Sequence, residues 1–357
     1  MGWYDIYPIK SDFPAPFNNR EKYARIAAWG YAEVVGSKLA GIAAGQTLYG
    51  FLPISTSYED LRVEYSQHNG EVMSDQIVVL DEHRQHVLKI YNRYQVCPPL
   101  SQLEHHKGLD SLGWDSLLQD LFATSFNMSK HAFAWEDQNR IHPSGQGDWS
   151  AADADLRDAT VIVLNALSKT GMSFAYSLRH NRPEKHQPKT IIGVGSSASI
   201  NTIASSGLYD QAVLNSDAEA VAVDIANSRT RRIVQFDFGV REGAYEHWKS
   251  AIARTSIAFT LITVGGETCV QNPEKAHKRL ANLSEIVQVN APKLREKGIE
   301  SEGAEDFQEF SRAFDNFKGK IAGMRLKWGE GLEGWKDGWE ALCRDEVKAD
   351  TGLVYRV

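Results

Sequence analysis

The sequence predicts an α/β protein in which a doubly wound parallel sheet follows a smaller β-rich domain. In the middle of the chain, five short apolar runs alternate with stretches of helical length, as in parallel strands joined by right-handed crossovers. The runs cover residues 161–164, 190–194, 212–215, 232–239 and 256–266. Upstream of them, alternating side chains and glycines indicate antiparallel strands and turns.

Residues 160–172 are central to this prediction, because a buried strand there leads through a turn of small polar residues into a helix. Ser168 and Thr170 lie in the turn, where the first amides and the positive dipole end of a helix favour a phosphate. Gly171 is the one residue of the usual three-glycine dinucleotide fingerprint that is present. Taken alone, the turn is equally compatible with an ordinary strand–helix connection.

Ligands in such sheets bind beyond the carboxyl ends of the strands. The segments expected at that edge are 168–171, 195–197, 237–239 and 263–266.

Composition limits the class of protein. A chain of 357 residues favours two domains, and a net charge of −7 without a basic tract argues against a nucleic-acid partner. No apolar run has the length of a membrane span, and residues 1–10 do not have the pattern of a signal peptide, so we expect a cytoplasmic protein. Cys97, Cys269 and Cys343 are odd in number and far apart, which supports neither a disulfide framework nor a zinc cluster.

The β-rich part begins near residue 25, after an irregular segment (1–19) whose aromatic residues we expect to be buried. Gly41, Gly45 and Gly50 are expected at turns around a strand at 47–49, with a kinked strand before them. Further strands are predicted at 58–65 and 76–81.

Three regions outside the sheets have patterns of their own. Residues 109–126 predict an amphipathic helix, and the polar segment 137–156 predicts an exposed insertion or linker. After the sheet we expect helices at 273–297 and 302–317, a last helical region that carries Trp328, Trp335 and Trp339, and a terminal strand at 353–357.

Two segments, WGYAEVV at 29–35 and GIAAGQTLYG at 41–50, resemble the first domain of the medium-chain dehydrogenase/reductase superfamily. Gly41, Gly45, Leu48 and Gly50 fall on its glycine-bearing turn motif, and Gln46 stands in the acidic place. The resemblance implies a GroES-like domain followed by a Rossmann domain. It places residues 1–115, with a return at 301–357, in the substrate domain and residues 116–300 in the NADP-binding domain.

Within that superfamily the chain is most similar to a little-characterised branch catalogued only as a domain of unknown function. The matching segments are 29–34, 91–94 and 167–171, and the likeness covers most of residues 20–270. Zinc-dependent relatives carry a Gly-His-Glu segment and a four-cysteine lobe that this sequence lacks, so the resemblance implies the zinc-free arm of quinone and enoyl reductases and no metal. Additional strands that usually precede the Trp-Gly segment are shortened here, at the wall of the substrate pocket.

The cofactor expected is NADPH. An NAD site places an acid at the end of the second sheet strand, and such a carboxylate would repel a 2′-phosphate; Ser196 and Ser197 stand there instead. Lys169, beside the phosphate turn, is a candidate cation for the cofactor, although a lysine solvated at a helix start explains it too. The resemblance further places residues at the nicotinamide end, each of which is also compatible with an ordinary strand terminus: Asp237, Gly239, Thr263 and Gly265.

Reduction by hydride transfer requires orientation and a hydrogen-bond donor near the oxygen that gains charge. Tyr91 and Asn92 are the candidates for polarising a carbonyl, with Tyr49 behind them, and merely structural roles remain open for all three. His105 and His106 are expected at the surface, since neighbouring histidines point apart. For His131 and Trp135, a place in the core of a helix is favoured over one lining the cleft.

Two functional hypotheses remain. The first is an NADPH-dependent reductase of an activated C=C bond (an enone, quinone or enoyl thioester), of the kind found in secondary metabolism, that binds a small hydrophobic and in some cases carrier-bound substrate. The second is a fold repurposed for non-redox work, as an isomerase or cyclase or as the partner of a larger synthase. A homodimer is compatible with either, and neither a nucleic acid nor a membrane is expected as partner.

Overall fold

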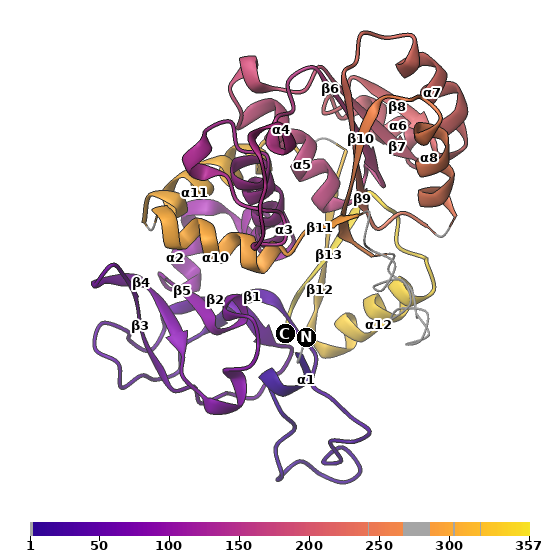
Figure 1. Cartoon of the computed structure of the whole chain (residues 1–357). Helices are drawn as coiled ribbons and strands as arrows, with labels where there is room; N and C mark the ends of the chain where they lie inside the picture. The colour runs from indigo at the N-terminus through magenta and orange to yellow at the C-terminus, as the bar shows by residue number, and fades with distance from the viewer. Residues whose placement is uncertain (1–2, 242, 267–285, 303, 322) are drawn as a thin grey trace. The chain divides into compact units, whose positions relative to one another are not determined.

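The structure is a computed structural model that describes residues 3–241, 243–266, 286–302, 304–321 and 323–357. Contacts within the chain divide it into two compact units. Unit 1 comprises Met1–Asp120 and Arg325–Val357, and unit 2 comprises Leu121–Met324. Each unit contains its own sheet, so the two are described separately (Figure 1).

Unit 1 contains a five-stranded antiparallel sheet in the order β1-β2-β5-β4-β3. The strands are β1 (Ala27–Glu33), β2 (Thr47–Pro53), β3 (Val63–His68), β4 (Glu71–Val79) and β5 (Arg93–Cys97). The helical segments around it are α1 (Trp3–Ile6), η1 (Glu82–Arg84), η2 (Lys89–Asn92), α2 (Leu100–Lys107) and α3 (Leu109–Asn127), of which α3 continues into unit 2. The prediction of a strand at 58–65 is wrong for its first half, because the chain is extended without ladder pairing until Val63.

The glycines before and in β2 have different roles. Gly41 and Gly45 have φ values of 90° and 88°, so they form the predicted turns. The prediction of a turn at Gly50 is wrong, since this residue lies inside β2 opposite Gly30. A Cβ atom at Gly50 would lie 2.4 Å from the ring of Tyr94, so the missing side chain makes room for that ring.

A buried guanidinium links the segments of unit 1. Arg84 Nε donates to Asn92 Oδ1 (3.0 Å), and Arg84 Nη2 donates to the carbonyl of Tyr91 (2.6 Å) and to the hydroxyl of Tyr94 (2.8 Å). Its charge also lies 4.9 Å from the ring centre of Tyr7, which belongs to the N-terminal segment. Tyr7 is therefore one buried aromatic residue of the N-terminal segment, as the sequence predicted for this segment. The side chains of Trp3 and Tyr4 lie outside the described residues.

The C-terminal part of unit 1 is a strand–helix–strand unit with two parallel strands, β12 (Arg325–Glu330), α12 (Gly331–Cys343) and β13 (Thr351–Arg356). Trp328 lies on β12 and not, as predicted, in the last helix, whereas the predicted terminal strand is confirmed. This strand–helix–strand segment packs closely on α3 at two glycines, where a Cβ would clash. Gly113 of α3 faces Trp328, and Gly352 of β13 faces Leu117. Trp328 Nε1 also donates to Asp110 Oδ1 (2.8 Å).

Unit 2 contains the predicted parallel sheet, with six strands in the order β11-β10-β9-β6-β7-β8. The strands are β6 (Ala159–Leu164), β7 (Thr190–Gly195), β8 (Gln211–Leu214), β9 (Arg232–Phe238), β10 (Ala258–Gly265) and β11 (Val287–Gln288). The predicted fold class is confirmed, since a β-rich antiparallel sheet is combined with a doubly wound parallel one.

The helical segments of unit 2 lie between and after these strands. They are the π-helical turn η3 (Met128–Ala132), η4 (Asp137–Asn139), α4 (Ala151–Ala154), α5 (Lys169–His180), η5 (Glu184–His186), α6 (Ile200–Ser205), η6 (Asn215–Asp217), α7 (Ala218–Ala226), α8 (Ala244–Ala253), α10 (Ala291–Glu302) and α11 (Ala304–Lys318). The predicted helix at 302–317 is confirmed by α11. Of the predicted helix at 273–297, the part up to residue 285 lies outside the described residues, and α10 begins at Ala291.

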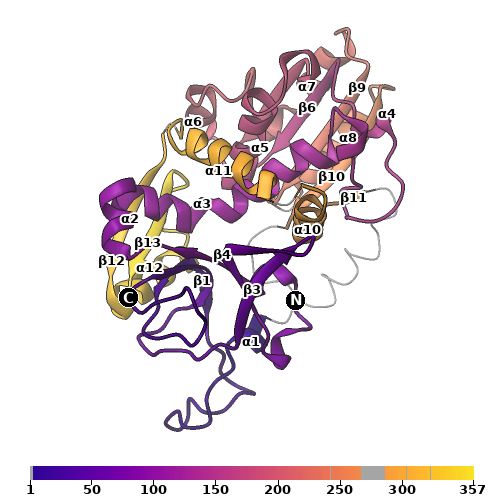
Figure 2. The same ribbon diagram turned by 90° about the vertical axis from the view of Figure 1, so that its left-hand side faces the viewer.

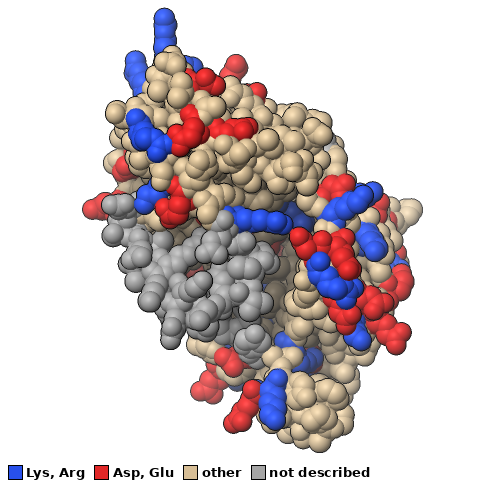
Figure 3. Space-filling view, turned by 90° about the vertical axis from the view of Figure 1, so that its right-hand side faces the viewer, with Lys and Arg blue, Asp and Glu red and all other residues tan. Residues whose placement is uncertain are grey.

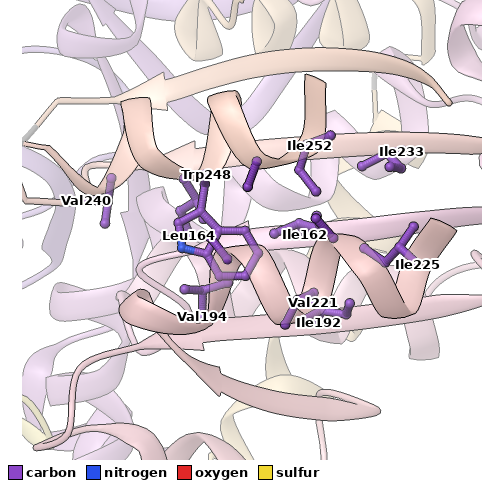
Figure 4. Packing of buried hydrophobic residues seen from close by; sticks show 13 residues of the cluster. Ile162, Leu164, Ile192, Val194, Val221, Ile225, Ile233, Val240, Trp248 and Ile252 are labelled. Atoms are coloured by element: carbon purple, nitrogen blue, oxygen red, sulfur yellow. The ribbon is translucent and has the colours of Figure 1, made fainter. Parts of the chain in front are cut away.

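Both faces of the parallel sheet are buried. On one face, Ile162 and Leu164 of β6 pack with α7 and α8 around the buried indole of Trp248 (Figure 4). On the other face, Phe174 of α5 lies 4.5 Å from Phe236 of β9, measured between ring centres. All six residues of β6 are buried, which explains the continuous apolar run that predicted it.

The segment before the sheet is anchored at several points, so the prediction of an exposed insertion at 137–156 holds for only part of it, such as residues 146–148 and 150–152. Trp149 Nε1 donates to the carbonyl of Ala132 (2.6 Å), and Pro143 and Gly145 are buried, with a Cβ at Gly145 meeting Lys293 of α10. Phenylalanines of α11 pack on Phe122 of α3, where Figure 2 shows the two helices adjacent.

We expect Gly338→Ala to destabilise unit 1 by about 1–3 kcal/mol, because a Cβ there would lie 1.6 Å from the hydroxyl of Tyr355. The Tyr355 ring cannot retreat freely, since Gly329 lies against its other edge. Urea denaturation measures the effect. Gly334→Ala is the matched control in the same helix: its nearest neighbour would be 3.9 Å away, and helix propensity should make it neutral or stabilising by up to about 1 kcal/mol. Equal effects of the two substitutions would contradict this account.

Candidate functional site

The turn after β6 uses three residues to connect strand and helix. Asn165 has a φ of 59°, the left-handed conformation that glycine usually supplies in a tight turn. Ser168 is the N-cap of α5, and its Oγ accepts a hydrogen bond from the amide of Gly171 (3.1 Å). A Cβ at Gly171 would lie 2.9 Å from Ser168 Oγ and 3.1 Å from the carbonyl oxygen of Asn165, so a larger residue there would have to displace the turn.

These residues cover two of the three tasks of a dinucleotide fingerprint. Asn165 makes the tight turn, and Gly171 permits close approach of helix and strand. The middle position, at which a glycine lets the backbone approach a pyrophosphate, is occupied by Ser168. Asn165 adds a contact that glycine could not make, because its Nδ2 lies 3.3 Å and 3.2 Å from the carbonyls of Phe238 and Gly239 at the end of β9.

The start of α5 offers an electropositive surface. The amides of Lys169 and Thr170 belong to the first turn, where a helix has no acceptors of its own for its N–H groups. Burial lowers the pKa of the Lys169 ammonium, and within the described part of the chain no carboxylate lies within ion-pair distance of it. A bound anion would offset this cost of desolvation.

The second strand ends without an acid. Ser196 and Ser197 follow β7 and are exposed, and the Ser196 amide donates to Ser199 Oγ (2.9 Å). A Cβ at Gly195 would lie 2.3 Å from Ile203 Cδ1, which brings α6 close to the strand.

The other predicted cofactor residues continue along the same edge, because Leu164, Asp237 and Thr263 are register partners on the adjacent strands β6, β9 and β10. Asp237 Oδ1 accepts hydrogen bonds from the amides of Gly239 and Val240 (2.9 Å each), so the carboxylate forms the turn after β9. The carbonyl of Thr263 accepts from Val289, and Gly265 is exposed beyond a bulge.

The three predicted catalytic residues lie together in unit 1. Tyr91 and Tyr49 flank Trp29, with ring centres 6.1 Å and 6.2 Å from its own. The Tyr49 hydroxyl donates to the carbonyl of Asp115 (3.0 Å). Both ends of the Asn92 amide are bonded to Arg84, as acceptor from Nε and as donor to the carbonyl (2.9 Å). An amide held at both ends has a structural role, and the catalytic role of Asn92 stays a prediction.

A cavity of about 1080 Å³ lies within unit 1 and is one feature that the sequence did not suggest. Its aromatic lining comes from the sheet (Trp29, Tyr31, Phe51, Tyr91) and from the C-terminal unit (Trp328, Trp335, Trp339, Tyr355). The sequence signal for it was the spacing of Trp335 and Trp339, which are one helical turn apart and each directly follow a glycine.

A buried polar group borders this cavity. The Tyr31 hydroxyl donates to Asp115 Oδ2 (2.7 Å), and Lys107 Nζ lies 3.2 Å from the same oxygen. Burial, with the Asp115 charge beside it, raises the pKa of Tyr31, and burial raises the pKa of the nearby Cys97 thiol to about 11. Tyr31 is therefore a neutral donor at ordinary pH, and Cys97 is a thiol and not a thiolate.

Of the four residues predicted at the surface or in the core of a helix, three lie as expected, and the prediction for Trp135 is wrong, because this residue is half-buried in a bend after the π-helical turn. His105 and His106 are exposed on α2, and His131 is buried in the π-helical turn, where Nδ1 lies 3.1 Å from the carbonyl of Asn139.

Within the described ranges, no cluster of three or more His, Cys, Asp or Glu residues is arranged to hold a metal ion, and none of the helices has the length and apolarity of a membrane span. Figure 3 shows one face on which basic side chains stand beside acidic ones.

A family model matches residues 1–348 of the chain. The chain belongs to this family, the protein of unknown function DUF2855. The match confirms the prediction of a branch catalogued only as a domain of unknown function. No curated protein matches this DUF2855 chain.

Solved structures to which the DUF2855 chain is similar include CurA from Vibrio vulnificus in complex with NADPH, at 12% identity over 98% of this chain and 93% of that chain, with a TM-score of 0.43. Another is the human synaptic vesicle membrane protein VAT-1 homolog-like protein, at 10% identity over 93% of this chain and 89% of that chain, with a TM-score of 0.39. A third is an alcohol dehydrogenase zinc-binding domain protein from Burkholderia ambifaria, at 12% identity over 74% of this chain and 62% of that chain, with a TM-score of 0.40. At these identities and TM-scores the likeness carries no argument about activity.

We expect Asn165→Ala to be less stable than Asn165→Gly by about 1 kcal/mol, because alanine strains the left-handed conformation that glycine adopts freely. Both variants lose the contacts of the amide with Phe238 and Gly239, so their difference isolates the backbone conformation. Urea denaturation of the two variants measures it. An alanine variant as stable as the glycine variant would refute the role assigned to this φ.

Proposed function

We propose that this protein is an NADPH-dependent reductase of an activated C=C bond in an enone, quinone or enoyl thioester. Residues 116–300 are the NADP-binding domain in this proposal, and residues 1–115 with 301–357 form the substrate domain. The observation that carries it is the turn after β6, where Asn165, Ser168 and Gly171 create an amide-lined helix start beside a second strand without an acid.

The pyrophosphate of the cofactor would be held at the first turn of α5. The amides of Lys169 and Thr170 and the helix dipole favour negative charge there, and the hydroxyls of Ser168 and Thr170 add polar groups. The space under Gly171 that a Cβ would fill supports a backbone packed closely enough for this arrangement.

The preference for NADPH follows from charge. Ser196 and Ser197 can donate hydrogen bonds to a 2′-phosphate, whereas an Asp or Glu would repel it. Lys169, half-buried and without a described carboxylate partner, would contribute the cation. At the nicotinamide end we propose backbone contacts from Asp237, Gly239, Thr263 and Gly265.

Bound NADPH would supply a hydride to the β-carbon of the substrate. The chain's own task is then to stabilise the negative charge that develops on the substrate oxygen. Among the predicted donors, Tyr91 fits this task best, because it lines the aromatic cavity, whereas Tyr49 and Asn92 do not belong to the lining. Asn92 and Tyr49 would then position Tyr91 through the Arg84 cluster and the Trp29 ring.

A second candidate is non-redox work in the same fold, as an isomerase or cyclase or as a partner of a synthase. Ser168 favours it, because this side chain stands at the glycine position next to the pyrophosphate and already occupies the Gly171 amide. Titration with NADPH separates the two candidates, since a nucleotide that binds the chain changes its own fluorescence. Absence of binding at high micromolar NADPH would remove the reductase and leave the second candidate.

We expect Lys169→Ala to weaken NADPH about ten-fold or more, since a hydrogen bond to a charged group contributes about 1.5–3 kcal/mol, and to weaken NADH much less. Fluorescence titration with both nucleotides measures the two dissociation constants. Lys189→Ala is the control, because this exposed lysine precedes β7 at the amino edge of the same sheet. Equal weakening of both nucleotides would show that Lys169 does not read the 2′-phosphate.

We expect Ser196→Asp to lower NADPH affinity by about ten-fold or more while NADH affinity is kept or improved, because the new carboxylate repels the 2′-phosphate and can accept bonds from ribose hydroxyls. Ser196→Asn has nearly the same shape without the charge and should change the ratio of the two affinities little. If aspartate and asparagine act alike, the end of β7 does not set cofactor choice.

A further inference from the structure

The apolar stripe of α12 faces a cavity instead of a protein core. Trp335, Trp339 and Leu342 recur at helical spacing and all line the 1080 Å³ cavity. Trp339 is 47% and Leu342 54% exposed, and no side chain of α12 is fully buried. Large apolar side chains grouped in this way on a surface mark a binding site more often than chance exposure.

Two glycines let α12 lie close to its own strands beside the cavity. The backbone at Gly338 lies directly on Tyr355 of β13, and Gly334 approaches the backbone of Gly329. Glycines therefore pack the helix against its own two strands without side chains.

The cavity has the properties of a ligand site. Its volume of about 1080 Å³ is slightly above the roughly 300–1000 Å³ that is usual for small-molecule pockets. The ring centres of Trp335 and Trp339 on the helix lie 5.7 Å apart, and their ring planes are inclined by 30°. On the other wall, the ring of Trp29 packs against those of Phe51 and Tyr91. Flat rings of both groups can stack on an aromatic or unsaturated ligand.

The charges at the cavity argue for an uncharged occupant. The charged side chains in its lining are Glu104, Asp120 and Arg356, and Arg356 is paired with Glu104. In the described lining the one cationic side chain, Arg356, is thus already paired, so an anionic head group would enter an aromatic and aliphatic cavity without a compensating charge.

We propose that this cavity is a binding site for an uncharged apolar molecule with flat ring or unsaturated segments, and that Trp335 and Trp339 are its main contacts. The proposal concerns the same cavity to which the reductase proposal assigns Tyr91, but its test stands apart from that proposal, because every lining residue belongs to unit 1 and no nucleotide is needed for binding.

Two fluorescent probes with the same ring system test the proposal on the full chain without nucleotide. N-phenyl-1-naphthylamine is uncharged, and 1-anilinonaphthalene-8-sulfonate carries an added sulfonate. We expect saturable binding of the uncharged probe and binding of the sulfonated probe that is about ten-fold weaker or more. No saturable binding of the uncharged probe would overturn the site, and equal binding of the two would overturn the ligand class.

Substitutions locate the binding. Trp339→Ala should weaken the uncharged probe about ten-fold, as expected for an aromatic anchor, whereas Trp114→Ala, on α3 and outside the cavity lining, should leave it unchanged. Equal effects of the two substitutions would overturn the assignment to this cavity. Trp335→Phe keeps an aromatic ring in place and should weaken the probe less than Trp339→Ala, which provides a conservative variant if the alanine change prevents folding.

A charge substitution tests the basis for selectivity. Glu104→Gln removes the carboxylate from the partly exposed ion pair with Arg356 and leaves the arginine without that partner. The sulfonated probe should therefore bind more tightly, and binding of the uncharged probe should be unaffected. An unchanged ratio of the two affinities would show that the lining charge does not select the ligand.

Discussion

The complete burial of strand β6 is the constraint on which the arrangement of unit 2 depends. Its six residues have neighbouring strands on both sides and helices on both faces, so no side chain of the strand itself can reach a ligand. Polar chemistry is confined to the residues that follow it, Asn165 to Gly171, and to the ends of the adjacent strands. The same apolar packing that stabilises the sheet therefore determines where a ligand can bind.

Much of the fold was predictable because parallel strands buried on both faces consist of nearly continuous apolar residues, as in β6 and β7. The failures arose where a residue is determined by a distant partner. The local sequence around Gly50 indicates a turn, but the residue is a glycine because the ring of Tyr94 packs on it. The local sequence around Trp328 indicates a helix, but this residue pairs with Val354 of β13. Local sequence contains neither contact.

The candidate site was predictable to a similar degree. Ser168 and Gly171 could be placed because helix caps and close-packed glycines depend on local sequence. The left-handed Asn165 and the fixed amide of Asn92 could not, since one depends on the carbonyls of β9 and the other on a guanidinium eight residues away that has no carboxylate beside it in the described contacts. The cavity beside α12 depends on elements that are more than two hundred residues apart in the sequence.

The glycines of α12 have a further consequence for dynamics. Each glycine inside a helix costs roughly 0.5–1 kcal/mol relative to alanine, and Gly334 and Gly338 both lie in a helix of 13 residues that has no fully buried side chain. Such a helix opens locally at lower free energy than the sheet it adjoins. The backbone amides of α12 should therefore exchange with deuterium early, and a molecule stacked on its tryptophans would slow that exchange, which couples occupancy of the cavity to order at the end of the chain.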